Sequence, residues 1–279
     1  MAIIDTHIHV WDLDKVSYSW LEGNTSLLNQ TYALDQLQAD KDAVGIMGGV
    51  LVQAANSDEE TDWMLKTAAL HPWIMGVVGW VPLLDPDATL KAIEAYKANP
   101  MIKGFRHLVH DERNTKWLLQ EPVIESLRIL ATHGYTYDVV GTKLDHLKCV
   151  LTLSTEVPEL KMVLDHLNQP PIPDRKFGEW GQLIEEAALN QNLFVKISGL
   201  GLTANNPDWD ADMLKPFISL ALAAFGPQRC MMGGDWPVAL LAGNYQYTWA
   251  QYKTVINTLL NDQDQQHVYE LTARAFYGL

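Results

Sequence analysis

The stretch Ile3-Ile4-Asp5-Thr6-His7-Ile8-His9-Val10-Trp11 opens the chain with an apolar run that leads directly into two histidines. In a β-strand alternate side chains point the same way, so His7 and His9 are expected on one side of a first strand. Neutral imidazole is a common metal ligand, and two such rings could hold a metal ion or a polarised water. The alternative from these residues alone is a strand end with two solvated histidines.

After this stretch the chain contains seven more apolar segments typical of β-strands, and each is followed by a helical pattern. The strands are predicted at 44–52, 74–81, 102–108, 135–140, 161–165, 193–198 and 229–233. The helices are predicted at 33–42, 59–69, 88–97, 122–133, 144–154, 180–190, 213–225, 247–260 and 265–277. Regular β–α alternation favours a parallel sheet, and eight units favour a (β/α)8 TIM barrel as one domain over residues 1–279. A doubly wound open sheet is the alternative, but no strand is followed by a G-x-G-x-x-G or Walker A loop.

Composition, net charge and cysteine content limit the kinds of partner and cellular location that we expect. Of 279 residues 48% are hydrophobic and 19% charged, which suits a large folded core. A net charge of -14 argues against nucleic acid and anionic membranes, both of which favour basic surfaces. Cys149 and Cys230 form no C-x-x-C pair, and neither a signal peptide nor a membrane span is apparent, so a cytoplasmic protein is expected. Residues 12–32 are interpreted as an active-site loop over the barrel mouth.

Four residues stand out where the predicted strands end: His7, His9, His166 and Asp235. In a barrel of parallel strands the chemistry lies at the C-terminal strand ends, so these side chains are expected to converge. Three imidazoles and a carboxylate can hold one metal ion with a position open for water, and Asp235 is the predicted general base. Taken singly, His166 could be a buried core histidine and Asp235 a helix N-cap. Five other histidines, in loop or helix contexts, are interpreted as structural or surface residues: His71, His110, His133, His146 and His267.

With these motifs in view, the chain resembles the amidohydrolase superfamily, and within it the sugar-lactone hydrolase branch. The resemblance extends over the whole chain and rests on blocks at 4–11, 103–107, 111–112, 164–166 with Pro170, 196–200, 225–227, 233–238, 272–273 and 276–277. The most specific blocks are Leu164-Asp165-His166 and Gly233-Gly234-Asp235-Trp236-Pro237-Val238. The resemblance implies a hydrolase with a small-molecule lactone as its substrate.

The resemblance also implies roles for individual residues. His7, His9, His166 and Asp235 would form the central catalytic and metal site. The substrate would be bound by Arg106, His107, Trp11, Gln53, Trp80, Tyr137 and Trp236. Apart from the resemblance, Lys196 and Asp138 are candidates for contacts with substrate hydroxyls.

The chain departs from the superfamily pattern in ways that bear on the metal and the substrate. Binuclear members use a strand-four lysine and a strand-five histidine, whereas this chain has Arg106-His107 and Tyr137-Asp138. One divalent ion, with zinc the first choice, is therefore expected, and catalysis without a metal stays open. Gln169 replaces a lysine and Gly234 a serine found in relatives, so the substrate's hydroxyl or acid pattern is also left open.

We therefore predict a hydrolase that opens a sugar-acid lactone by attack of an activated water on the ester carbonyl. A metal-dependent decarboxylase of the same superfamily is one alternative, and a non-catalytic ligand-binding barrel is another. Release of carbon dioxide would identify the first, and an Asp235→Asn variant that retains affinity would identify the second. The sequence leaves a homo-oligomer open.

Overall fold

Eight parallel strands form one sheet in which each strand pairs with the next along the chain. The computed structural model describes all 279 residues. The strands are β1 (Ile4–Ile8), β2 (Gly48–Val52), β3 (Ile74–Gly79), β4 (Ile102–His107), β5 (Thr136–Val139), β6 (Met162–Leu164), β7 (Leu193–Ile197) and β8 (Cys230–Met232). The segment after β8 closes the ring on β1, because His9 N–H donates to Trp236 O (2.7 Å) and Asp235 N–H donates to His7 O (2.8 Å). The predicted (β/α)8 barrel is confirmed.

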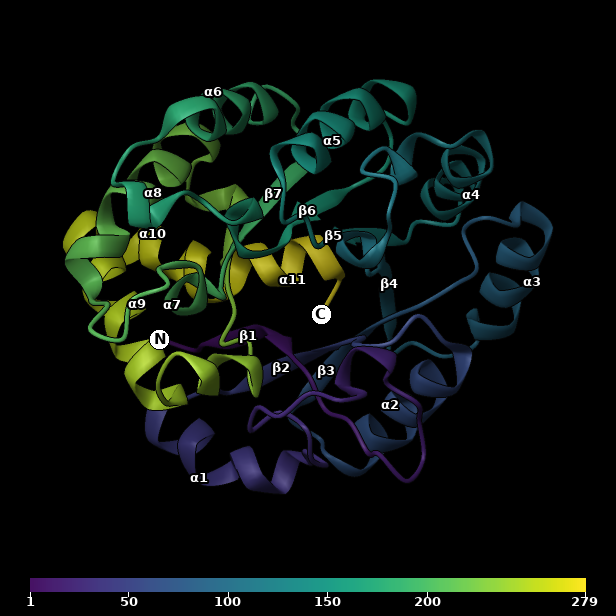
Figure 1. Ribbon diagram of the computed structural model, residues 1–279, viewed down its shortest axis with the longest axis horizontal. Coiled ribbons are helices and arrows are strands. Elements are labelled where there is room, and N and C mark those ends of the chain that lie inside the picture. Colours follow the sequence, from purple (N-terminus) through teal and green to yellow (C-terminus); the bar gives the residue numbers. More distant parts are fainter.

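The helices surround this ring (Figure 1). The long ones are α1 (Leu34–Val44), α2 (Asp58–Leu70), α3 (Pro86–Tyr96), α4 (Glu121–Thr132), α5 (Leu144–Glu156), α6 (Gly178–Ala187), α8 (Ala211–Phe225) and α9 (Tyr245–Leu259), and the short ones are α7 (Leu200–Thr203), α10 (Asp262–Gln266) and α11 (Thr272–Tyr277). Several begin at capping side chains: the Ser57 hydroxyl accepts from Glu60 N–H, and Asp85 and Asp210 cap α3 and α8 in the same way. None of the helices combines the length and apolar character needed to cross a membrane.

The structure differs from the predicted elements in three places. The strand expected from residue 44 begins at Gly48, because Val44 is still helical and Gly45, at φ +86°, ends α1 with a left-handed turn. The helix expected over 265–277 is α10, a five-residue π-helical segment (His267–Leu271) and α11 in succession. A short helix, α7, follows β7 and was not predicted.

Helix α11 lies within the ring of strands rather than outside it (Figure 1). Its Ala273, Phe276 and Tyr277 pack with inward-facing strand residues into a separate apolar cluster, whose other members are Ile4, Val50, Val52, Val78, Val163 and Met231. Lys103 Nζ donates to Gly278 O (3.0 Å) near the start of β4. The helix therefore seals the N-terminal end of the barrel, and only the C-terminal strand ends remain open to a ligand.

Candidate functional site

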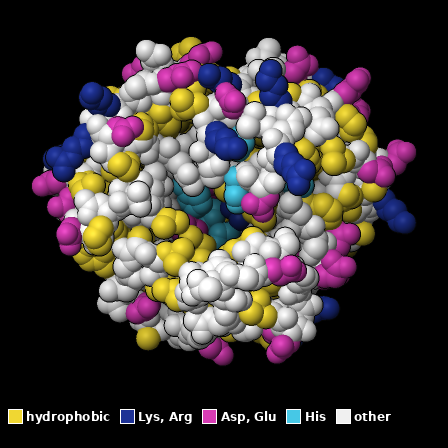
Figure 2. Space-filling model, in the orientation of Figure 1, with side chains coloured by type: hydrophobic (Ala, Val, Ile, Leu, Met, Phe, Trp, Pro, Cys, Tyr) yellow, Lys and Arg dark blue, Asp and Glu magenta, His cyan; other side chains and the backbone are white.

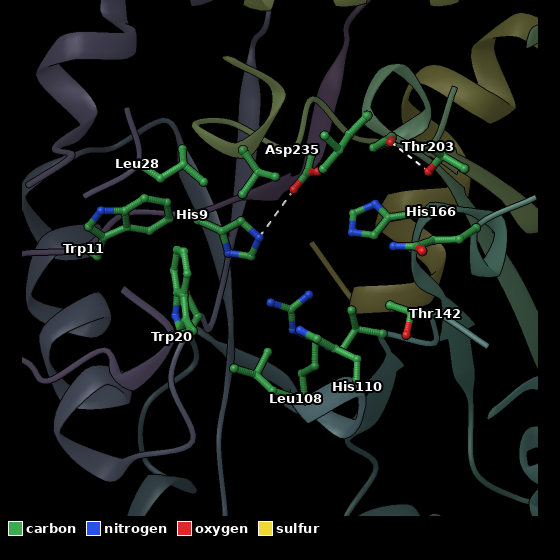
Figure 3. Close-up of a pocket in the computed structure, with 17 residues that line it drawn as sticks. His9, Trp11, Trp20, Leu28, Leu108, His110, Thr142, His166, Thr203 and Asp235 are labelled. Carbon is green, nitrogen blue, oxygen red and sulfur yellow. Dashed lines mark hydrogen bonds and ion pairs between the residues drawn. The ribbon is translucent and has the colours of Figure 1, made fainter. Parts of the chain in front are cut away.

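A cavity of about 260 Å³ opens at the C-terminal ends of the strands. We call it the main cavity, and Figure 2 shows the hollow with histidine side chains at its floor. Trp11, Trp20 and Leu28 form one side of it, and Figure 3 places His166, Thr142 and Thr203 across from them. Trp20 and Leu28 belong to residues 12–32, so this segment lies at the barrel mouth and forms part of the cavity wall.

The four side chains predicted to converge at the strand ends lie close together in the structure. Asp235 Oδ1 lies 3.5 Å from His9 Nε2 and 3.7 Å from His7 Nε2, and the two imidazole nitrogens are 3.1 Å apart. His9 Nδ1 is 2.7 Å from Val52 O, and because a carbonyl only accepts, Nδ1 carries the proton and Nε2 presents its lone pair to the cavity. The end of β1 and the segment after β8 thus bring two imidazoles and a carboxylate together.

His166 reaches the site from an unusual backbone. His166, Leu167, Asn168 and Gln169 all have φ between +50° and +55°, a left-handed turn directly after β6. The Ser198 hydroxyl lies 2.8 Å from His166 Nδ1 and fixes the ring. Gly199 allows the close packing, because a Cβ there would lie 2.6 Å from His166 Nδ1 and 3.1 Å from Asp235 Oδ2.

Beneath these rings lies a buried charge cluster that we define as Arg106, Asp138, Asp165 and Lys196. Arg106 Nη1 donates to Asp165 Oδ2 (3.0 Å), and Lys196 Nζ lies 2.5 Å from Asp138 Oδ2 and 3.1 Å from Asp165 Oδ1. Two cations and two carboxylates balance one another, which is how charges are tolerated in a protein interior.

The cluster adjoins His7, whose Nδ1 lies 3.3 Å from Lys196 Nζ and 3.4 Å from Asp165 Oδ1. Burial lowers the pKa of His7 well below its usual range; Asp165 opposes this shift and Lys196 adds to it. Burial likewise lowers the pKa of His9. Burial alone would raise the pKa of Asp165, but the neighbouring cations Lys196 and Arg106, together with a hydrogen bond from His7, hold it well below its usual range. The two imidazoles are therefore neutral near pH 7, the form in which histidine binds a metal or accepts a proton.

The predicted substrate-binding residues separate into two groups. Trp11 and Arg106 line the main cavity. The walls of this cavity do not include the other five, which are Gln53, Trp80, His107, Tyr137 and Trp236. Side chains alternate along a strand, so Arg106 points into the barrel while the next residue, His107, points out, where it stacks on Trp117 at 3.9 Å between ring centroids. His107 also accepts from Trp80 Nε1–H (3.1 Å), and Gln53 Oε1 accepts from Arg106 Nε–H (3.2 Å), so these side chains support the wall from behind.

Several lining residues were missed by the sequence interpretation. His110, taken there as structural or surface, lines the main cavity from the segment after β4. Thr142, Leu202 and Thr203 also line it, and so does Gln169, the residue already noted as differing from relatives and bearing on the substrate. All follow the C-terminal ends of predicted strands, a position that signals a site in this fold, but ordinary polar and apolar residue types gave no further cue.

His7, His166 and Asp235 fit a divalent cation. Their potential ligand atoms lie within 4.8 Å of one another and all three residues are buried. Two imidazoles and a carboxylate form a common ligand set in catalytic zinc sites. His9, predicted as a fourth ligand, lies outside this group of three, although its Nε2 faces Asp235.

The family model described as Amidohydrolase matches residues 4–279. The chain belongs to this amidohydrolase family. Among its relatives, an L-fucono-1,5-lactonase from Burkholderia ambifaria is 28% identical over 243 residues, covering 87% of this chain and 82% of that protein. An L-rhamnono-gamma-lactonase from Scheffersomyces stipitis is 25% identical over 205 residues, covering 64% and 60%. The crystal structure of a Burkholderia multivorans amidohydrolase with bound zinc matches with a TM-score of 0.90 and 28% identity, each chain being covered completely.

Proposed function

We propose that this amidohydrolase opens a sugar-acid 1,4- or 1,5-lactone by attack of water on the ester carbonyl. The observation that carries the proposal is the convergence of Asp235 Oδ1 on the His7 and His9 rings, at 3.7 and 3.5 Å, beside a cavity sized for one small ring. The related proteins named as L-fucono-1,5-lactonase and L-rhamnono-gamma-lactonase support this choice of substrate class.

The walls of the main cavity suit a hydroxylated ring with one apolar edge. Trp11, Trp20 and Leu28 give it an apolar side, and Thr142 and Thr203 give hydroxyl groups across from them. Ligand sites commonly combine an apolar wall with a few placed polar groups that set orientation and specificity. A lactone held between these two sides leaves its carbonyl free to meet the histidines and Asp235.

In the reaction Asp235 acts as general base on the attacking water and returns the proton to the ring oxygen as the ester C–O bond breaks. Arg106 lines the same cavity and is fixed by Asp165 and Gln53, so its positive charge stabilises the oxyanion that forms on the carbonyl oxygen. A divalent cation, such as zinc, held by His7, His166 and Asp235 would lower the pKa of bound water and polarise the carbonyl.

The test is a pH-indicator assay over five- and six-membered aldonolactones, with and without a chelator. The wild-type protein should release one proton per lactone opened and no carbon dioxide. Asp235→Asn should lower kcat by about 10²- to 10⁴-fold, the usual contribution of a general base. Asp212→Asn, an exposed aspartate on α8, is the matched control and should behave as the wild type. Unchanged turnover in Asp235→Asn, or no lactone opened by the wild type, would contradict the proposal.

A further inference from the structure

A second cavity, of about 560 Å³, adjoins the main cavity near the N-terminal ends of α5 and α6. Thr142 and Gln169 belong to the walls of both cavities, so the two meet at these side chains. Helices α5 and α6 lie side by side at this part of the rim (Figure 1). At about 260 Å³ the main cavity falls just below the usual range for ligand sites of about 300–1,000 Å³, so it accommodates one small ring. A larger ligand would extend into the second cavity.

The junction of the two cavities is built on strained backbone. Gln169 is the last residue of the left-handed turn that also presents His166. Such backbone costs non-glycine residues about 1–2 kcal/mol each, and it persists where surrounding contacts enforce it, commonly at ligand sites. Here Trp180 Nε1–H donates to Leu167 O (2.8 Å) and Asn168 Nδ2–H donates to Lys143 O (3.3 Å). The turn thus places His166 at the main cavity and Gln169 at the junction.

An aromatic ring lines the second cavity in a fixed orientation. Phe177 is 38% exposed, yet it packs edge to face on Phe217, with 5.4 Å between centroids and 88° between planes. Gly181 makes room for it, because a Cβ there would lie 2.7 Å from Phe177 Cβ. The C–H face of a sugar ring is apolar and packs on such an aromatic face while its hydroxyls reach polar neighbours.

The charges around the second cavity favour a neutral ligand. Lys143 and Lys176 are matched in number by Asp174 and Glu179, and Glu179 lies 2.7 Å from Lys148 Nζ. A strongly charged ligand would meet side chains of its own sign, whereas a hydroxyl both donates to carboxylates and accepts from ammonium groups. An aromatic face among amides and charges of both signs matches a carbohydrate.

We propose that the second cavity binds a second sugar residue, joined through a glycosidic bond to the lactone ring in the main cavity. The proposal rests on the lactonase function above and extends its substrate class to the lactones of disaccharide acids. Only the ester C–O bond breaks: one water is consumed, the carbonyl carbon becomes a carboxylate with release of a proton, and the glycosidic bond stays intact.

The test compares gluconolactone with lactobionolactone, which carries a galactosyl group on the same ring. The wild type should hydrolyse both. Phe177→Ala should lower kcat/KM for lactobionolactone about tenfold, an upper value for an aromatic contact, and leave gluconolactone unchanged. Leu189→Ala removes another exposed apolar side chain, 79% exposed, and should change neither. Equal losses on both lactones in Phe177→Ala, or a wild type that opens gluconolactone alone, would overturn the proposal.

Binding of the open-chain products separates this proposal from the lactonase function, because it needs no turnover. Calorimetry should show that lactobionate binds the wild type more tightly than gluconate does, and that Phe177→Ala removes the difference. This result would stand even if no lactone were hydrolysed. If inorganic phosphate instead competed with lactobionate and Lys176→Gln abolished that competition, the cavity would be an anion site and the proposal would be wrong.

Discussion

Replacing Lys196 with methionine should destabilise the protein strongly, because this ammonium group balances two buried carboxylates. Lys196 is fully buried, and its Nζ lies 2.5 Å from Asp138 Oδ2 and 3.1 Å from Asp165 Oδ1. Methionine has a similar length and fills the same space, so the change removes the charge with little change in packing. Asp165 keeps Arg106 as a partner, whereas Asp138 keeps only the Tyr277 hydroxyl, at 2.7 Å.

Breaking a buried ion pair by removing one partner typically costs about 3–5 kcal/mol, since the remaining charge is left unpaired in a poorly polarisable interior. We expect a loss of this size in the free energy of unfolding measured with urea. At about 2 °C per kcal/mol for a chain of this length, the melting temperature should fall by roughly 6–10 °C. Lys148→Met is the matched control, because the exposed pair of Lys148 with Glu179 at 2.7 Å should contribute less than about 1 kcal/mol.

A second substitution shows whether the unpaired carboxylate is the cause. Asp138→Asn in the Lys196→Met background replaces the stranded charge with a neutral amide, and the double variant should regain about 1–3 kcal/mol over the single variant. The reasoning is refuted if Lys196→Met loses less than about 1 kcal/mol, or if the double variant is less stable than the single one.

Three further outcomes follow from the site and its surroundings. Burial raises the pKa of Glu60 from 4.5 to about 8, so between these pH values the folded protein retains a proton that the unfolded chain releases. The free energy of unfolding should therefore fall as pH rises through this window, and the melting temperature of Glu60→Gln should depend less on pH than that of the wild type. Gly199→Ala would push a Cβ against His166 and Asp235 and should lower kcat about 10²-fold, whereas Gly134→Ala, also at positive φ but with no atom within 4 Å, should keep wild-type turnover. Removing a bound divalent cation with a chelator should lower kcat, because the cation would polarise the lactone carbonyl. Elemental analysis of the purified protein measures the metal content. Undiminished turnover in metal-free protein would show that Asp235 and Arg106 catalyse the reaction without a cation.

The barrel could be predicted from the sequence because its eight strand–helix units repeat the same alternation of apolar runs and amphipathic segments. The convergence of His7, His166 and Asp235 followed from that fold, since parallel strands end at one rim. The sequence does not show which residue of a strand end faces the barrel interior, because adjacent side chains point to opposite faces of the sheet. Arg106 and His107 were both expected at the substrate, but the pleat allows only Arg106 inside.

The parts of the site that depend on unusual backbone were beyond sequence reasoning. Nothing in the residues 166–169 marks four consecutive left-handed conformations, which non-glycine residues rarely adopt. Contacts from distant segments hold this turn, among them the Trp180 indole on Leu167 O. The position of Gln169 between two cavities therefore emerges only when the tertiary contacts are known.

The position of α11 within the barrel bears on how the protein acquires its structure during synthesis. The ribosome delivers β1 first, but the apolar floor of the barrel stays open until residues 272–277 emerge to cover Ile4 and Val50. A nascent chain that lacks this segment exposes apolar interior to water and leaves Asp138 without the Tyr277 hydroxyl. Folding of the central ring is therefore completed after translation of its last helix, and chains terminated before residue 272 should be aggregation-prone.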